Sequence, residues 1–420
     1  MTQITYTETL TALRHYDVIV AGGGVAGCAA AIQAAQNGKS VLLLEKTTLL
    51  GGLATIGLVN YFVPMCNGRG KQIIFGLCDK WFRDVCRYGY DTVPAAWQEG
   101  EPQEPTDVRM VNRYSPNIFA LWLTEEVRRA GVELRFDCQA VTPVMEGNVA
   151  KGVITQGKEG RSYFTCSMLV DTTGDADLLR RCGMPTVEGK NFYTYYGFSV
   201  SLDSCKTALE KGDVAHLYRF VRGGCVDLYG HGQPENVPLW SGLSSSDVTD
   251  YLLRNQKDLF AAIEQDDPKS RDLALLPTMP QFRTTCHIAG DYTLKESDTY
   301  RHFEDSVCAI NDFDRRDYLY EVPLRTLCRR DHPNLITAGR SASGEGYAWD
   351  VLRVIPPAIL TGQAAAEAAC LAIDTGCPIA CVDIPTLQRR LEKSNIMIHF
   401  PDSLVPKKGE GGEKYESDHV

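Results

Sequence analysis

The hydrophobic pattern near the N-terminus predicts a strand, a glycine turn, a helix and a second strand. Residues 17–24, DVIVAGGG, form a short apolar run that ends in glycines, which is typical of a buried strand. Residues 25–37 are mostly small and apolar and stop before Gly38, which predicts a helix. Residues 40–46, SVLLLEK, form a second apolar run. This order predicts a βαβ unit and therefore a parallel sheet.

The next part of the chain predicts a capped helix followed by strands. In residues 115–131, Ser115 is suited to the N-cap, Pro116 to the first turn and Gly131 to the position after the last turn. Residues 132–155 alternate as two strands joined by a hairpin do. Residues 168–183, MLVDTTGDADLLRRCG, predict a strand that enters a glycine-containing turn and a short helix.

The pattern changes between residues 191 and 327, where aromatic residues, mixed strands and two amphipathic helical stretches replace the βαβ order. Residues 334–340, NLITAGR, then form another buried strand that ends in glycine, and a helix of small residues follows. The fold class is therefore α/β, with a Rossmann-like domain (a parallel sheet in ββα-type layers) interrupted by an inserted mixed α+β substrate domain.

This interpretation gives four segments. Residues 1–190 form the first part of the nucleotide-binding domain, 191–330 the insertion, and 331–380 the segment that completes the first domain. Residues 381–420 hold a C-terminal helix and a polar tail that we predict to be disordered.

Composition narrows the classes of partner. The 420 residues carry a formal net charge of −10, which argues against nucleic acid as a partner. The start lacks a basic and then apolar signal pattern, and no apolar run is long enough to span a membrane, so we expect a cytoplasmic protein without a membrane span. None of the 15 cysteines forms C-x-x-C, which predicts free thiols and no metal site.

The glycine turn carries the first candidate chemistry, because Gly22, Gly24 and Gly27 form G-x-G-x-x-G between a strand and a helix. Such glycines allow a tight turn, close approach of a pyrophosphate and close packing of the helix on the strand. Glu45 ends the second strand, 18 residues after Gly27, where a carboxylate accepts hydrogen bonds from a ribose hydroxyl. The context predicts dinucleotide binding, and a purely structural glycine turn is the alternative.

Residues 17–55, which add the pair Gly51-Gly52, resemble the FAD-binding opening of FAD-dependent oxidoreductases of the glutathione-reductase-like superfamily. They are most similar to the branch related to fumarate reductase and succinate dehydrogenase flavoproteins. LVDTTGDADLLRRCG, YEVPLRTL, NLITAGRSAS and LRVIPPAILTGQAAAEAACLA resemble later motifs of that family, whereas residues 191–278 match least.

The resemblance implies noncovalently bound FAD. Succinate dehydrogenase flavoproteins attach FAD to a histidine, but this chain has no histidine between His15 and His216, and Cys66 is the one alternative attachment residue in the motif order. The residues implied to contact FAD are Gly22, Gly24, Val25, Ala26, Gly27, Glu45, Lys46, Gly51, Gly52, Ala54, Thr55, Ala140, Thr173, Gly174, Gly339, Arg340, Leu352, Val354 and Ile355.

Residues 347–360, YAWDVLRVIPPAIL, place an arginine and two prolines at the start of a small-residue helix. The resemblance implies that this helix points its N-terminus at the flavin edge that becomes negative on reduction. Arg353 is then a candidate catalytic residue, and a salt bridge to Asp350 is the alternative. The family often has Gly-Ser before LRV, so Trp349 and Asp350 put the usual flavin contacts there in doubt.

Arg283 and His287 are the remaining candidate catalytic residues, because PQFRTTCHIAGDYTL resembles a family strand that is commonly richer in arginine. A histidine beside a flavin could act as a general base, and a structural histidine is the alternative. We find no second G-x-G-x-x-G unit for NAD(P)H, so an external electron donor or acceptor is expected.

These observations predict an FAD-dependent oxidoreductase that transfers a hydride between a small organic substrate and flavin N5. The alternatives are an alkene (enoate) reductase similar to fumarate reductase and a non-catalytic flavin-binding protein. The sequence leaves the substrate, the direction of reaction and a homo-oligomeric state open.

Overall fold

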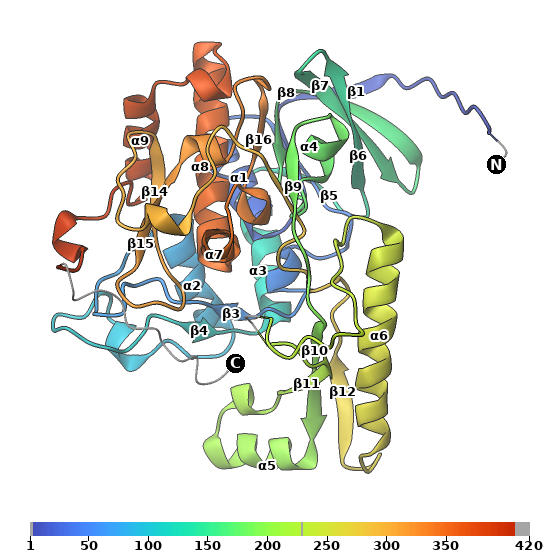
Figure 1. Ribbon diagram of the computed structural model, residues 1–420, viewed down its shortest axis with the longest axis vertical. Coiled ribbons are helices and arrows are strands. Elements are labelled where there is room, and N and C mark those ends of the chain that lie inside the picture. The colour runs from blue at the N-terminus through green and yellow to red at the C-terminus, as the bar shows by residue number, and fades with distance from the viewer. Residues whose placement is uncertain (1–2, 228–229, 408–420) are drawn as a thin grey trace.

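The computed structural model describes residues 3–227 and 230–407, and a mostly parallel sheet covered by helices forms its larger part (Figure 1). The strand order in this sheet is β5-β2-β1-β8-β7-β6, with β16 also paired to β8. Its strands are β1 (Ala12–Ala21), β2 (Val41–Leu44), β5 (Glu133–Arg135), β6 (Gln139–Glu146), β7 (Val149–Gly157), β8 (Gly160–Asp171) and β16 (Leu335–Thr337).

The parallel part of the sheet joins segments that lie far apart in the sequence. β1 pairs in parallel with β2 and with β8, and β16 pairs in parallel with β8 from Leu335↔Leu169 to Thr337↔Asp171. The hairpin of β6 and β7 is antiparallel, as the alternating pattern predicts. The predicted α/β fold class with a parallel sheet is therefore confirmed.

The helices among the described residues differ in character, since α1 and α8 are buried along most of their length, whereas α2, α3, α5, α6 and α9 are amphipathic. Their bounds are α1 (Val25–Gln36), α2 (Gly76–Tyr88), α3 (Pro116–Arg129), α4 (Asp177–Arg181), α5 (Leu202–Lys211), α6 (Ser245–Glu264), α7 (Tyr347–Arg353), α8 (Ile355–Thr375) and α9 (Ile384–Lys393).

Helices α1 and α8 pack closely against each other because small residues line their contact. A Cβ atom on Gly362 would lie 2.3 Å from the carbonyl oxygen of Ala26, so a larger residue would force the two helices apart. The predicted capping of α3 is confirmed, since Ser115 accepts a hydrogen bond from the Ile118 N–H and Pro116 begins the helix.

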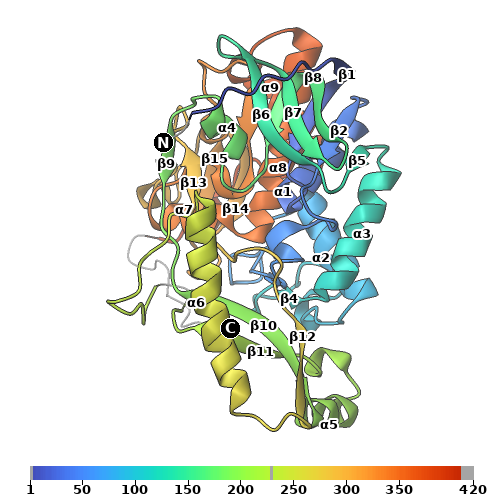
Figure 2. The same cartoon turned by 90° about the vertical axis from the view of Figure 1, so that its right-hand side faces the viewer.

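The predicted insertion contains a separate antiparallel sheet, which projects from the main body with α6 alongside it (Figure 2). Its order is β11-β10-β12, and buried aromatic residues, including Trp240, Tyr251 and Phe282, pack beneath it. The strands are β10 (Thr194–Ser201), β11 (Arg219–Gly224) and β12 (Arg271–Leu275). α5 and α6 match the two amphipathic helical stretches that the sequence predicts.

Shorter antiparallel ladders pair β3 (Tyr61–Phe62) with β4 (Asn112–Arg113), β9 (Thr186–Glu188) with β13 (Cys286–Ile288), and β14 (Ser306–Asn311) with β15 (Leu319–Pro323). Of these, the β9–β13 ladder joins the predicted insertion to the segment before it. Val307 and Val322 of the β14–β15 hairpin belong to the same hydrophobic cluster as α1 and α8. The domain boundaries, including the one at residue 330, stay predictions.

The predicted C-terminal helix corresponds to α9, and the tail prediction for residues 408–420 falls outside the described residues. All 15 cysteines are free, and ten are buried, as expected for reduced thiols. Within the described ranges, no single helix has the length and apolar composition to cross a membrane, although α7 and α8 meet both conditions jointly across a 73° bend.

Candidate functional site

The glycine turn joins the end of β1 to the start of α1 and leaves no room for side chains at two positions. Gly22 has φ +103°, and a Cβ there would lie 2.5 Å from the Thr172 carbonyl oxygen. A Cβ on Gly27 would lie 1.9 Å from the Gly22 carbonyl oxygen. Both glycines are therefore required for α1 to begin directly at the edge of β1 and β8.

Gly24 differs from these two, because a Cβ built on it would meet no protein atom within 4 Å. It is the N-cap of α1, and no side chain caps that helix. The N-terminus of α1 thus presents its N–H groups, and about half a positive charge, to open space. An anionic group such as a pyrophosphate fits this position.

The second glycine motif lies directly against the first. Gly51 donates a hydrogen bond from its N–H to the Gly23 carbonyl oxygen (2.8 Å), and it forms an isolated parallel bridge with Gly24. A Cβ on Gly52 would lie 3.2 Å from the Gly24 Cα. The two motifs therefore form one continuous surface, the glycine surface. Ala54 and Thr55, which follow Gly52, are buried.

Glu45 is held at this surface by three donors. Its Oε2 accepts from the Gly23 N–H, and its Oε1 accepts from both the N–H and the hydroxyl of Thr47, each at 2.7 Å. A carboxylate has about four lone-pair positions, so one remains for a ribose hydroxyl. Lys46, the next predicted contact, is exposed.

The start of α8 lies beside the start of α1. A Cβ on Gly339 would be 3.1 Å from the Ala26 Cβ and 3.5 Å from the Ala358 Cβ, so Gly339 touches the first turns of both helices. No side chain caps α8, whose N-cap is Val354, and proline occupies its first turn. Two uncapped helix N-termini therefore converge on one region, which suits a ligand with separate anionic parts.

Arg340 and Gly174 meet, but the arginine side chain is already engaged. Its guanidinium donates to the carbonyl oxygens of Gly174 (2.7 Å) and Phe282 (2.5 Å) and to the Asp175 carboxylate (2.7 Å). Arg340 thus connects the turn after β8 with the segment that carries Arg283. Thr173 donates from its N–H and hydroxyl to the buried Asp171 carboxylate.

Two further residues that were predicted to contact FAD, Ala140 and Leu352, lie in β6 and in α7. Ala140 lies in β6, two residues after Cys138, whose N–H donates to the Glu45 carbonyl oxygen at 3.1 Å. Leu352 is buried in the last turn of α7.

Arg353 forms the salt bridge that the sequence offered as the alternative interpretation. Its Nε (2.8 Å) and Nη2 (2.5 Å) both donate to one oxygen of Asp350. Arg283 lies close enough for the two guanidinium groups to repel each other. Burial, followed by this repulsion from Arg353, lowers the pKa of Arg283 to about 10. The structure therefore gathers two cations and one carboxylate where α7 faces the insertion.

His287 is buried in β13, with 2% of its surface exposed, and its ring packs edge-on against Trp349 at 4.4 Å between centroids. Its Nδ1 lies 2.6 Å from the Ile288 carbonyl oxygen, which can only accept, so Nδ1 carries the proton. In the neutral ring Nε2 is then an acceptor. Burial lowers the pKa of His287 and so favours this neutral form.

One residue that positions this region, Asn191, was missed from the sequence, whereas Trp349 was singled out there. Asn191 accepts from the Arg283 N–H (2.7 Å) and donates to the Thr285 hydroxyl (3.2 Å), which fixes the strand that carries His287. Trp349 donates from its indole N–H to the Arg340 carbonyl oxygen (2.8 Å). The sequence around Asn191 holds no signal for this role. Gly23, whose N–H donates to Glu45, was also left out of the predicted contacts, although its place in the middle of GGG could have indicated it.

The covalent attachment alternative finds little chemical support. Cys66 is buried and its sulfur accepts from the Met110 N–H at 3.3 Å. Burial raises the pKa of this thiol, which keeps it protonated and a poor nucleophile.

The model of the family described as "FAD dependent oxidoreductase" matches residues 17–216 and 248–391, more than half of the chain. Two curated relatives also match. One is a digeranylgeranylglycerophospholipid reductase of Methanospirillum hungatei, 27% identical over 41% of this chain and 42% of that protein. The other is a vinyl phenol reductase of Lactiplantibacillus plantarum, 56% identical over 10% of this chain and 9% of that protein. The matched regions thus span less than half of either relative.

Among solved structures, p-nitrophenol 4-monooxygenase of Pseudomonas putida is 14% identical with a TM-score of 0.47, covering 93% of this chain and 91% of that chain. A myxobacterial chondrochloren halogenase is 15% identical with a TM-score of 0.42, covering 90% and 79%. From the family match and the fit of the glycine surface to a dinucleotide, the chain belongs to the FAD dependent oxidoreductase family, and its cofactor is FAD.

Proposed function

We propose that this enzyme transfers a hydride between a small organic substrate and FAD, and that it exchanges electrons with an external donor or acceptor rather than with NAD(P)H on a second domain of its own. The observation that carries the proposal is the approach of Arg283 to Arg353, the last residue of α7, together with the packing of His287 on Trp349 of the same helix. When bound, FAD supplies the hydride chemistry at its N5 atom.

The cofactor contacts follow from the surface described above. Gly24 and the first turn of α1 would hold the pyrophosphate, and Glu45 a ribose hydroxyl. The start of α8, with Gly339, Val354 and Ile355, would face the flavin end. The remaining residues predicted to contact FAD would line the binding site between the pyrophosphate and the flavin ring.

The two arginines would bind and orient the substrate. Arg353 uses Nε and Nη2 on Asp350, and within the described ranges its Nη1 has no hydrogen-bond partner. Arg283 keeps its charge at neutral pH, since its pKa of about 10 is still well above 7. A carboxylate or another electron-rich group on the substrate would accept a hydrogen bond from the Nη1 of Arg353.

His287 would accept a proton at Nε2 in an oxidation, because its Nδ1 proton is fixed on the Ile288 carbonyl oxygen. The same atom could return that proton in the reverse direction. A histidine that only packs against Trp349 is the competing interpretation, and it predicts normal turnover after substitution by glutamine.

Alkene (enoate) reduction, in the branch related to fumarate reductase, is the second candidate. Both curated relatives are named reductases, and the arginine pair offers a proton donor and an anion clamp. In this direction Arg283 or Arg353 would donate the proton to the substrate carbon that does not receive the hydride.

The deciding experiment is anaerobic flavin spectroscopy with a panel of hydroxy acids, sugars, amines and enoates. Bleaching by an oxidisable substrate would establish the dehydrogenase direction. Reoxidation of chemically reduced enzyme by an enoate would establish the reductase. A flavin that responds to neither class would contradict both and leave a non-catalytic flavin-binding protein.

We also expect FAD to be noncovalently bound, since the chain has no histidine from Tyr16 to Ala215 and Cys66 is buried and protonated. Acid precipitation should move the yellow colour into the supernatant. A yellow pellet, with flavin mass on the peptide that carries Cys66, would overturn this expectation.

A further inference from the structure

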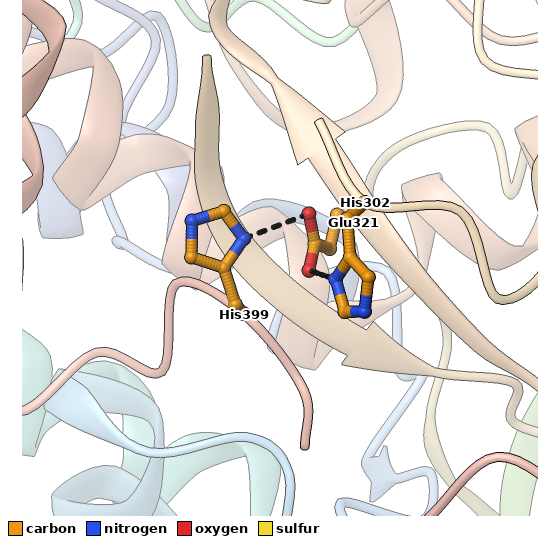
Figure 3. A group of neighbouring side chains, drawn as sticks. All are labelled: His302, Glu321 and His399. Carbon is orange, nitrogen blue, oxygen red and sulfur yellow. Dashed lines mark hydrogen bonds and ion pairs between the residues drawn. The ribbon is translucent and has the colours of Figure 1, made fainter. Parts of the chain in front are cut away.

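Three titratable side chains from separate segments meet at the β14–β15 hairpin (Figure 3). Glu321 belongs to β15, His302 precedes β14, and His399 follows α9. One possible ligand atom from each lies within 4.8 Å of the others. Sequence spacing predicts no metal site here, because the three residues are not close in the chain.

Glu321 is the fixed member of this group. Its side chain is 0% exposed, and its Oε2 accepts from the Phe303 N–H at 2.7 Å. The two histidines point their Nδ1 atoms at the same carboxylate, His302 at 2.5 Å and His399 at 3.0 Å. Their side chains are 42% and 46% exposed, so one side of the group faces solvent.

Asp402 adds an outer partner, because its carboxylate lies 2.9 Å from the Nε2 of His302. A histidine that binds a metal commonly gives its other ring N–H to a carboxylate, which fixes the tautomer and the ring orientation. With Nε2–H held by Asp402, the Nδ1 of His302 is the atom left for a metal.

We propose that His302, Glu321 and His399 bind a divalent transition metal of the Zn²⁺ type. Two imidazole nitrogens and one carboxylate oxygen suit such an ion, which forms bonds of about 2.0–2.2 Å with its ligands roughly 3.4 Å apart in tetrahedral geometry. Small rotations of the two half-exposed imidazoles bring the ligands to this spacing. Water completes the coordination from the solvent side, and the Nδ1 proton of His302 passes to solvent as the ion binds.

The site would have a structural role, because His399 lies in the segment that follows α9 and is hydrogen-bonded to β14. The Ser306 hydroxyl donates to the Ile398 carbonyl oxygen at 2.7 Å, and the Ala309 N–H donates to the Met397 carbonyl oxygen at 2.6 Å. The buried Phe400 packs against the His302 ring at 4.5 Å between centroids. A metal would therefore clamp the C-terminal segment onto β14 and β15.

The test uses untagged, chelator-treated protein with its flavin bound. Equilibrium dialysis against Zn²⁺, with atomic absorption as the readout, should show one saturable equivalent per chain. His302→Ala and His399→Ala should each weaken binding at least tenfold. His216→Ala is the matched control, because the His216 side chain is as exposed as that of His302 (42%) and lies 3.9 Å from a single carboxylate, that of Asp213. Its binding should equal that of the wild type.

A second measurement separates loss of the site from loss of the fold. Flavin content should stay normal in all three variants, since the substituted side chains are partly exposed. Zn²⁺ should raise the Tm and slow proteolysis near residues 396–400 in the wild type and in His216→Ala, but not in His399→Ala. Absence of saturable binding, or equal binding in both cluster variants and the wild type, would overturn the proposal.

Discussion

The glycine surface and the region around Arg353 differ in which groups supply the charge, backbone N–H groups in the first and side chains in the second. At the glycine surface, backbone N–H groups at the starts of α1 and α8 supply the positive potential, and the Glu45 side chain supplies hydrogen-bond acceptors. Around Arg353, the guanidinium groups of Arg353 and Arg283 supply the charge, and both already contact protein groups. Changes at the glycine surface should therefore alter cofactor affinity, whereas changes around Arg353 should alter rates.

The largest changes in FAD affinity and stability are expected from substitutions of Gly24 and Gly27. Gly24→Ala adds a Cβ in space free of protein atoms, so the fold should survive at a cost of about 0.5–1 kcal/mol while FAD affinity falls at least tenfold. Gly27→Ala places its Cβ 1.9 Å from the Gly22 carbonyl oxygen and should lower stability by about 1–3 kcal/mol or more. Flavin titration and thermal unfolding of each apoprotein measure the two effects. Equal losses of stability in both variants would contradict the assignment of Gly24 to the cofactor.

Glu45→Ala should weaken FAD binding by about 1–3 kcal/mol, because it removes the ribose acceptor and leaves buried donors of Gly23 and Thr47 unpaired. Thr47→Val is the control, since it removes only the hydroxyl that donates to the same carboxylate. Isothermal titration of both apoproteins gives the comparison. An equal loss of FAD affinity in both variants would mean that Glu45 only stabilises the turn and does not bind the ribose.

Arg353→Ala tests the other region. We expect the rate of flavin reduction or reoxidation to fall tenfold or more, equivalent to about 1.4 kcal/mol or above, with FAD affinity unchanged. Asp350→Asn is the matched variant, because it removes the charge of the arginine's partner but keeps the arginine. Stopped-flow spectroscopy and thermal unfolding are the measurements. Normal rates with lower stability in both variants would make the pair purely structural.

The smallest effect should come from His287 and depend on pH. Burial lowers its pKa in the folded state below about 6.5, the usual value in an unfolded chain. The folded protein therefore favours the neutral ring, and this contribution to stability is complete above pH 6.5 and is lost as the pH falls toward the folded pKa. His287→Gln should show a smaller fall in Tm between pH 7.5 and 5. Parallel Tm curves for the two proteins would contradict a lowered pKa.

Much of the fold could be predicted because its signals are local. Apolar runs of a few residues, Ser115 before a helix and glycines at Gly22 and Gly27 act on neighbouring atoms, so their consequences appear in the sequence itself. The glycine surface followed for the same reason, since its two motifs lie within one βαβ unit and the turn after it.

The sequence by itself determined the βαβ order, the glycine turn and the acidic residue that ends β2. Only the tertiary structure decided that Arg283 lies beside Arg353, that Asn191 fixes the strand of His287, and that His302, Glu321 and His399 share one place. The physical reason is that backbone sterics and side-chain periodicity act over a few residues, whereas charges from distant segments meet only after sheets and helices have packed. Packing then sets which of them are buried, which repel and which lie within a few ångströms of one another.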